Sequence, residues 1–211
     1  MEIARFGLNA VTVSFVGTIV FSVIMSWGFW RQARAIWRER SGRSLSAPSF
    51  LYATFVRIPI LVYGLSIGSL ALLVNGTVPF FPLLLIVLGL RKYKGFGRRE
   101  WLLVAALSAA VALTAVLPDK GAVFMSWMFG SVAFNALQPL EMWRRRSAGV
   151  MEIRMLLMGL ASNTFWLVYA FAIGDWLLEV INPAFSAINI TSLILWLVFR
   201  RRKRGTETKT T

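Results

Sequence analysis

The sequence predicts an all-α membrane protein in which seven transmembrane helices form two parallel three-helix bundles joined by a linker helix (3+1+3). Three observations predict this fold: an apolar composition, an internal repeat and an alternation of basic and uncharged loops. Of the 211 residues, 57% are hydrophobic and only 15% are charged, with a mean hydropathy of +0.67. Because soluble domains carry about 25% charged residues, most of this chain is expected to lie in a bilayer.

The repeat is visible in two short basic motifs, residues 31–42 and 137–149, which share residues at one constant offset. The same register continues downstream, and it slips by one residue before the last matched pair. An internal repeat fixes the architecture of a chain. The matched pairs are Gln32 and Gln138, Trp37 and Trp143, Ser41 and Ser147, Tyr63 and Tyr169, Gly68 and Gly174, and Asn75 and Asn182.

Apolar stretches, each near the length of about 20 residues that a helix needs to cross a bilayer, predict the individual spans. The stretch 100–117 has no repeat counterpart and no internal charge, and this single extra crossing gives both repeats the same orientation. The predicted spans are 8–30, 48–66, 69–90, 100–117, 121–142, 153–173 and 176–199. The predicted domains are a first repeat (1–95), a linker helix (96–118), a second repeat (119–204) and a tail (205–211).

The net charge of +14 is concentrated in three loops, near residues 31–43, 91–99 and 144–154, and in the tail. Nearly uncharged loops separate them. This alternation follows the positive-inside rule, so the N-terminus is expected outside and the C-terminus in the cytoplasm. The pattern favours contact with a lipid bilayer over nucleic acid. It also leans toward a prokaryotic inner membrane, and it leaves a homo-oligomer open.

The chain contains no Cys, no His and only nine acidic residues. Thiol chemistry, the commonest metal ligand and the commonest proton shuttle are therefore missing. Most of the acidic residues lie at termini or span ends. We expect no enzyme, no metal and no cofactor.

The order of these motifs resembles the SWEET and PQ-loop transporter family over nearly the whole chain. Its Pro-Gln motif is represented by Gln32 and Gln138, with Arg31 and Leu137 in place of the Pro, and Arg40-Ser41 and Arg146-Ser147 hold the basic-Ser position. The family's later pattern of Trp, Tyr, Asp and Asn is matched by Trp166, Tyr169, Asp175 and Asn182. The first half has Tyr63 and Asn75, with Ile60 in place of the Trp.

The resemblance implies facilitative transport of a small polar solute, most simply a mono- or disaccharide, by alternating access at a pocket between the repeats. It implies that Asn75, Trp166 and Asn182 line that pocket, and that Gln32, Gln138, Tyr63, Tyr169 and Asp175 act at gates or hinges. Asn amides suit hydroxyl groups, and a Trp face suits a sugar ring. Alternatively, the two Asn residues bond helix to helix and Trp166 belongs to an interfacial belt.

Arg57 and Glu179 depart from the family pattern. Arg57 lies near the middle of its predicted span, its repeat counterpart is Asn163, and Glu179 lies one turn from Asn182. An Arg at that depth costs about 2.5–3.5 kcal/mol and normally has a partner. Either Arg57 holds the bundle together through Glu179 or freed carbonyls, or it binds an anionic or zwitterionic solute. Two further functions remain open: a proton-coupled carrier of amino acids or organic anions, and a membrane cargo receptor.

Overall fold

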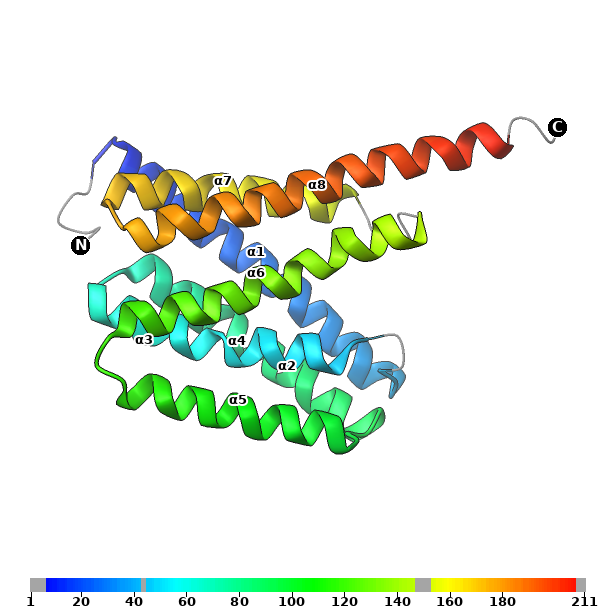
Figure 1. Ribbon diagram of the computed structural model, residues 1–211, viewed down its shortest axis with the longest axis horizontal. Helices are drawn as coiled ribbons and strands as arrows, with labels where there is room; N and C mark the ends of the chain where they lie inside the picture. Colours follow the sequence, from blue (N-terminus) through cyan, green and yellow to red (C-terminus); the bar gives the residue numbers. More distant parts are fainter. Residues whose placement is uncertain (1–6, 43–44, 147–152, 208–211) are drawn as a thin grey trace. The chain divides into compact units, whose positions relative to one another are not determined.

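The computed structural model describes residues 7–42, 45–146 and 153–207, which form eight α-helices and no strand (Figure 1). α2 and α3 follow each other as one apolar segment, Ala47–Ile67. The described part therefore contains seven helical segments, in the order that the sequence predicts. The helices are α1 (Ala10–Glu39), α2 (Ala47–Phe55), α3 (Arg57–Ile67), α4 (Leu70–Tyr93), α5 (Arg98–Val116), α6 (Lys120–Arg145), α7 (Ile153–Ile173) and α8 (Trp176–Glu207).

Six of the seven segments are long and apolar enough to cross a membrane by length and composition. α6 has the length, with 26 residues, but Asn135 and Gln138 lower its hydropathy. Many large apolar side chains on the outer faces are exposed, among them Val16, Phe81 and Leu102. Exposed apolar faces of this extent are expected where lipid is the solvent.

α1 is longer than the sequence predicts, because the basic motif after residue 30 continues the helix to Glu39 instead of forming a loop. Its Arg, Gln, Ala and Glu residues are good helix formers. Ala33 and Ile36 are also buried in a core cluster with Leu83, Ile86 and Leu90. The basic residues after residue 30 therefore show where the apolar stretch ends, but the helix itself continues beyond them. α8 likewise continues past residue 199, to Glu207.

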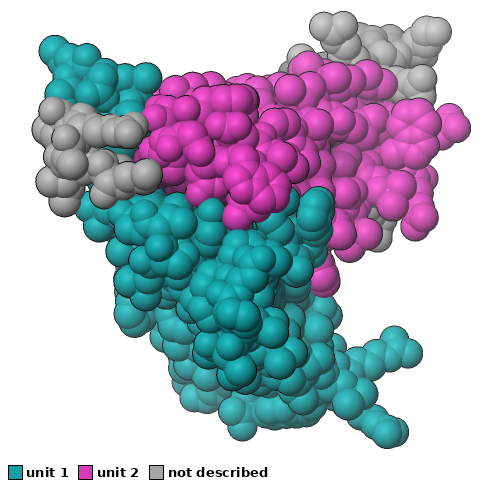
Figure 2. Space-filling view, turned by 60° about the vertical axis from the view of Figure 1, so that its left-hand side comes forward, with its two compact units in different colours: residues 1–131 teal, residues 132–211 magenta. Residues whose placement is uncertain are grey.

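The chain divides into two compact units, residues 1–131 and 132–211 (Figure 2). In the first unit, α4 packs against α1, α2 and α3, and α5 packs along α2. In the second unit, α7 and α8 run side by side (Figure 1). The second unit has its own core cluster of Met142, Leu156, Leu195, Trp196 and Phe199.

The second crossing is broken at Val56, between α2 and α3. Pro59 follows three residues later, and proline disfavours a continuous helix through the preceding turn. The break separates the packing of α2 from that of α3, which approaches α4 closely at Gly76. A Cβ atom at Gly76 would lie 2.5 Å from Leu61 Cγ and 3.1 Å from the Arg57 carbonyl oxygen. Glycine at this position therefore brings Arg57 close to α4.

The repeat is preserved in the backbone of two turns. Gly68 ends α3 and Gly174 follows α7, with φ of 67° and 69°. The next residue caps the following helix in both copies: Ser69 Oγ accepts from Leu72 N at 3.3 Å, and Asp175 Oδ1 accepts from Leu178 N at 3.2 Å.

A second matched turn ends α1 and occurs again after α6. Arg40 (φ 48°) and Arg146 (φ 47°) are the only non-glycine residues with positive φ in the described part of the chain. They occupy the same position of the repeat. Both copies therefore use an arginine in the left-handed region, which is uncommon for a residue with a side chain.

Candidate functional site

In the first unit, the predicted site residues Arg57 and Asn75 contact each other directly. Arg57 Nη1 donates to Asn75 Oδ1 at 2.9 Å and to the Asn75 carbonyl oxygen at 3.4 Å. Arg57 Nε donates to the carbonyl oxygen of Ala53 at 3.3 Å, beside the helix break. The Asn75 amide in turn donates from Nδ2 to Ser22 Oγ on α1 at 3.0 Å. A chain of hydrogen bonds thus links α1, α4 and α3 through three polar side chains.

Sequence reasoning missed Ser22. It belongs to a line of small hydroxyl residues that repeat every fourth residue along one face of α1, and all of them are buried. Each hydroxyl donates to a carbonyl oxygen of its own helix, as Ser22 does to Thr18 at 2.8 Å. The fourfold spacing is the signal that could have revealed this face. Its members are Ser14, Thr18, Ser22 and Ser26.

In the second unit, Asn182 and Trp166 also lie together. Both are buried, and Asn182 Nδ2 donates to the Leu178 carbonyl oxygen at 2.8 Å and to the Trp166 carbonyl oxygen at 3.5 Å. The Trp166 ring meets Tyr169 edge to face, with centroids 5.7 Å apart. Tyr169 is fully buried. Each unit therefore places its repeat-equivalent asparagine in a bridge between two neighbouring helices.

Asn163, the repeat counterpart of Arg57, lies on α7. Its Nδ2 is the only buried side-chain nitrogen or oxygen without a hydrogen-bond partner among the described residues. Glu179 on α8 is half-buried, and its carboxylate makes no hydrogen bond or ion pair within the second unit as described. The Asn163 amide thus has an unused donor, and the Glu179 carboxylate has unused acceptors within its unit.

The predicted gate and hinge residues have varied surroundings. Tyr63 is buried and stacks on Phe124, with centroids 4.3 Å apart, whereas Asp175 accepts two backbone N–H groups as the cap of α8. Gln32 is half-buried near the end of α1, and Gln138 lies on α6. Ser147 of the second basic-Ser motif lies outside the described residues.

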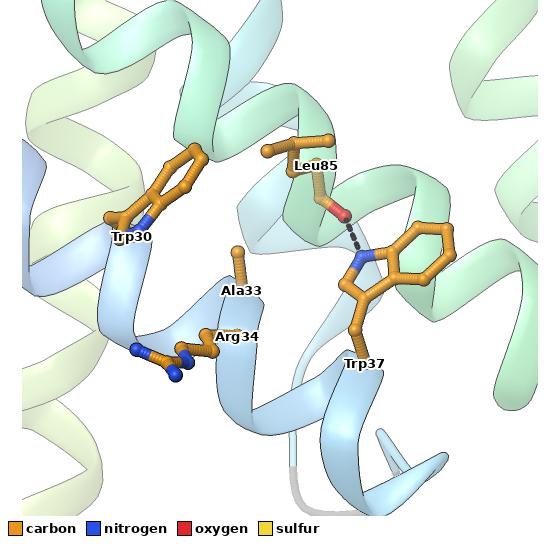
Figure 3. Close-up of a pocket in the computed structure, with 5 residues that line it drawn as sticks. All are labelled: Trp30, Ala33, Arg34, Trp37 and Leu85. Atoms are coloured by element: carbon orange, nitrogen blue, oxygen red, sulfur yellow. Dashed lines mark hydrogen bonds between the residues drawn. The ribbon is translucent and has the colours of Figure 1, made fainter.

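A separate groove of about 430 Å³ lies beside the first basic motif. Figure 3 shows Trp30, Ala33, Arg34 and Trp37 on α1 facing Leu85 on α4, with the Trp37 indole N–H donating to the Leu85 carbonyl oxygen at 3.0 Å. The groove contains none of the predicted pocket residues. Trp37 therefore ties the end of α1 to α4 and does not line the polar site.

Comparison with known proteins supports the resemblance in two ways. Residues 121–204 match a family described as "Sugar efflux transporter for intercellular exchange". The fold is similar to that of a eukaryotic SWEET transporter, with a TM-score of 0.74 and 15% sequence identity over 91% of this chain and 97% of that chain. No curated protein matches the chain. The resemblance to the SWEET family is thereby confirmed, and the solved structure fits the expected seven-helix 3+1+3 arrangement.

Proposed function

We propose that this chain, which has the SWEET fold and matches a sugar-efflux family over its second repeat, is a facilitative transporter of a small polar solute, with a mono- or disaccharide as the simplest substrate. The supporting observation is the pair of repeat-equivalent asparagines, Asn75 and Asn182. Each is held by hydrogen bonds of its own unit. An Asn amide has two donor hydrogens and two acceptor lone pairs, so both side chains keep capacity for solute hydroxyl groups.

The solute binds at a polar pocket to which both repeats contribute, and transport proceeds by rocking of the two three-helix bundles. Trp166 supplies an apolar face for a sugar ring. The left-handed residues Arg40 and Arg146 follow Gln32 and Gln138 at the same spacing in both repeats, which is consistent with equivalent hinge positions. We also propose that the N-terminus lies outside and the C-terminus in the cytoplasm.

Uptake into proteoliposomes tests the function directly. Labelled glucose and sucrose should enter down their gradients, without a pH gradient or a membrane potential. Asn182→Ala should lower uptake at least tenfold. Asn189→Ala is the matched control because Asn189 also lies on α8, is half-buried and donates only to its own helix, to the Phe185 carbonyl oxygen at 3.2 Å. If no small polar solute crosses at all, the proposal fails.

The orientation has an independent test. The chain has no Cys, so a single Cys introduced at an exposed position reports its side by labelling with an impermeant maleimide. A Cys at Ser41 should be labelled only from the cytoplasmic side, and a Cys at Asp119 only from outside. Reversed labelling would contradict the proposed topology.

Proton coupling is the second candidate, and it is favoured by the Glu179 carboxylate, which has no partner among the described residues of its own unit. Asp175 is the weaker proton carrier, because two backbone N–H groups already bind its carboxylate oxygen. If protons drive transport, an imposed pH gradient should accelerate uptake and Glu179→Gln should abolish the acceleration. Unchanged pH dependence in Glu179→Gln would exclude this carboxylate as the coupling group.

A further inference from the structure

Within the first unit as described, the positive charge of Arg57 has no negative partner. Its three hydrogen bonds all go to neutral oxygen atoms, two on Asn75 and one on Ala53. Arg57 lies ten residues from the start of the segment Ala47–Ile67, about 15 Å along the helix, which is half of a hydrocarbon core about 30 Å thick. An intramembrane charge normally faces a partner or a water-filled cavity.

The guanidinium group also has unused donors. Of its five N–H groups, Nε and Nη1 account for three, and the two on Nη2 have no acceptor among the described residues of the first unit. Arg57 is half-buried, not fully buried. Each of these two N–H groups can donate one charge-assisted hydrogen bond to a carboxylate oxygen.

Asn75 holds Arg57 in place and keeps polar capacity beside it. Its Oδ1 accepts one bond from Arg57 and its Nδ2 donates one bond to Ser22. One N–H and one lone pair remain. A solute that carries a hydroxyl group next to a carboxylate would use both residues at once.

The second repeat also has an unused hydrogen-bond donor, but this donor carries no charge. Asn163, at the position equivalent to Arg57, keeps a buried N–H without an acceptor. Leaving such a donor unsatisfied is unfavourable. An acceptor-rich solute would satisfy it, and a carboxylate would find its charge partner only in the first repeat.

We infer that the solute is a hydroxylated carboxylate, such as a sugar acid, and that Arg57 binds its carboxylate through Nη2. This inference rests on the proposed transport function and names the substrate class. It predicts selection by charge, which a pocket for neutral sugars would not show. Arg57 is then the residue that determines specificity.

The experiment compares three solutes of nearly equal size in proteoliposomes: glucuronate, its neutral amide glucuronamide, and glucose. The membrane potential is clamped at zero. Wild-type protein should take up glucuronate at least tenfold faster than either neutral solute at equal concentration. Arg57→Gln should remove that preference among the solutes that still cross, and Arg57→Lys should retain part of the preference.

Arg99→Gln is the matched control, because Arg99 is exposed at the start of α5 and has no place in the site. Its solute preference should equal that of the wild type. Equal uptake of glucuronate and glucuronamide by the wild type would overturn the inference without needing any variant, and so would an unchanged preference in Arg57→Gln. If glucose crosses but glucuronate does not, the inference fails while the transport function stands. If none of the solutes crosses, the transport function itself fails.

Discussion

The hydrogen bond between Ser22 and Asn75 makes a sharp prediction about stability. Ser22→Ala removes the acceptor of the Asn75 N–H at 3.0 Å as well as a donor to the Thr18 carbonyl oxygen at 2.8 Å. Ser14→Ala is the matched control, because Ser14 is also buried on α1 and donates to carbonyl oxygens of its own helix. We therefore expect the difference between the two variants to report the bond to Asn75 alone.

The expected loss of stability follows from the Asn75 N–H, which loses its acceptor in Ser22→Ala. Interhelical hydrogen bonds in membranes average about 0.6 kcal/mol and reach about 1.7 kcal/mol, so Ser22→Ala should cost 0.6–1.7 kcal/mol more than Ser14→Ala. Asn75→Ala should cost more, about 2–5 kcal/mol, because it also removes the acceptor of a charged donor, Arg57, whose bond is worth about 1.5–3 kcal/mol.

Reversible unfolding in mixed micelles, followed by tryptophan fluorescence, measures these free energies of unfolding. In a double-mutant cycle, Ser22→Ala should cost about 0.6–1.7 kcal/mol less in the Asn75→Ala background than alone. Fully additive costs, or equal costs for Ser22→Ala and Ser14→Ala, would refute the hydrogen-bonded chain from α1 to Arg57.

Three further stability predictions follow from the backbone. Asp175→Ala should lower the free energy of unfolding by about 0.5–2 kcal/mol through loss of the α8 cap, and Asp175→Ser should restore most of it, as thermal unfolding can measure. Gly76→Ala should cost about 1–3 kcal/mol by overpacking against Leu61, whereas Gly28→Ala, where a Cβ meets nothing within 4 Å, should be neutral or stabilising in the same assay. Arg40→Gly should raise stability by up to about 1 kcal/mol, because a left-handed residue with a side chain costs roughly 1–2 kcal/mol and glycine gives back about 0.5–1 kcal/mol in chain entropy; a loss of stability would contradict this.

The sequence predicts the crossing segments and their order well, because twenty-residue apolar stretches admit little else in a bilayer. It misplaces the end of α1, because a helix that has left the hydrocarbon continues wherever its residues can still pack, as Ala33 and Ile36 do. The helix break before Pro59 can be predicted from the sequence, because proline constrains the backbone locally and independently of tertiary packing.

The candidate site is only partly visible in the sequence. Asn75, Arg57 and Asn182 stand out because amides and charges are rare in apolar stretches. Ser22 does not stand out, because a serine in a membrane helix usually donates a hydrogen bond to the backbone of its own helix. Whether it also accepts a bond depends on which helix packs against it. The family resemblance implies a gating role for Asp175, although Gly-Asp before an apolar run is also a helix-start signal. Its gating role stays a prediction beside the cap that it forms.

The matched turns at Gly68 and Gly174, and at Arg40 and Arg146, have a consequence for engineering. Because the two repeats share the same backbone turns, a side chain can be moved to the equivalent position of the other repeat without changing the backbone conformation. Exchanging Arg57 with Asn163 would move this positive charge from the first repeat to the second while conserving composition. In such an exchange the repeated backbone stays the same, and only the side chains that select the solute change position.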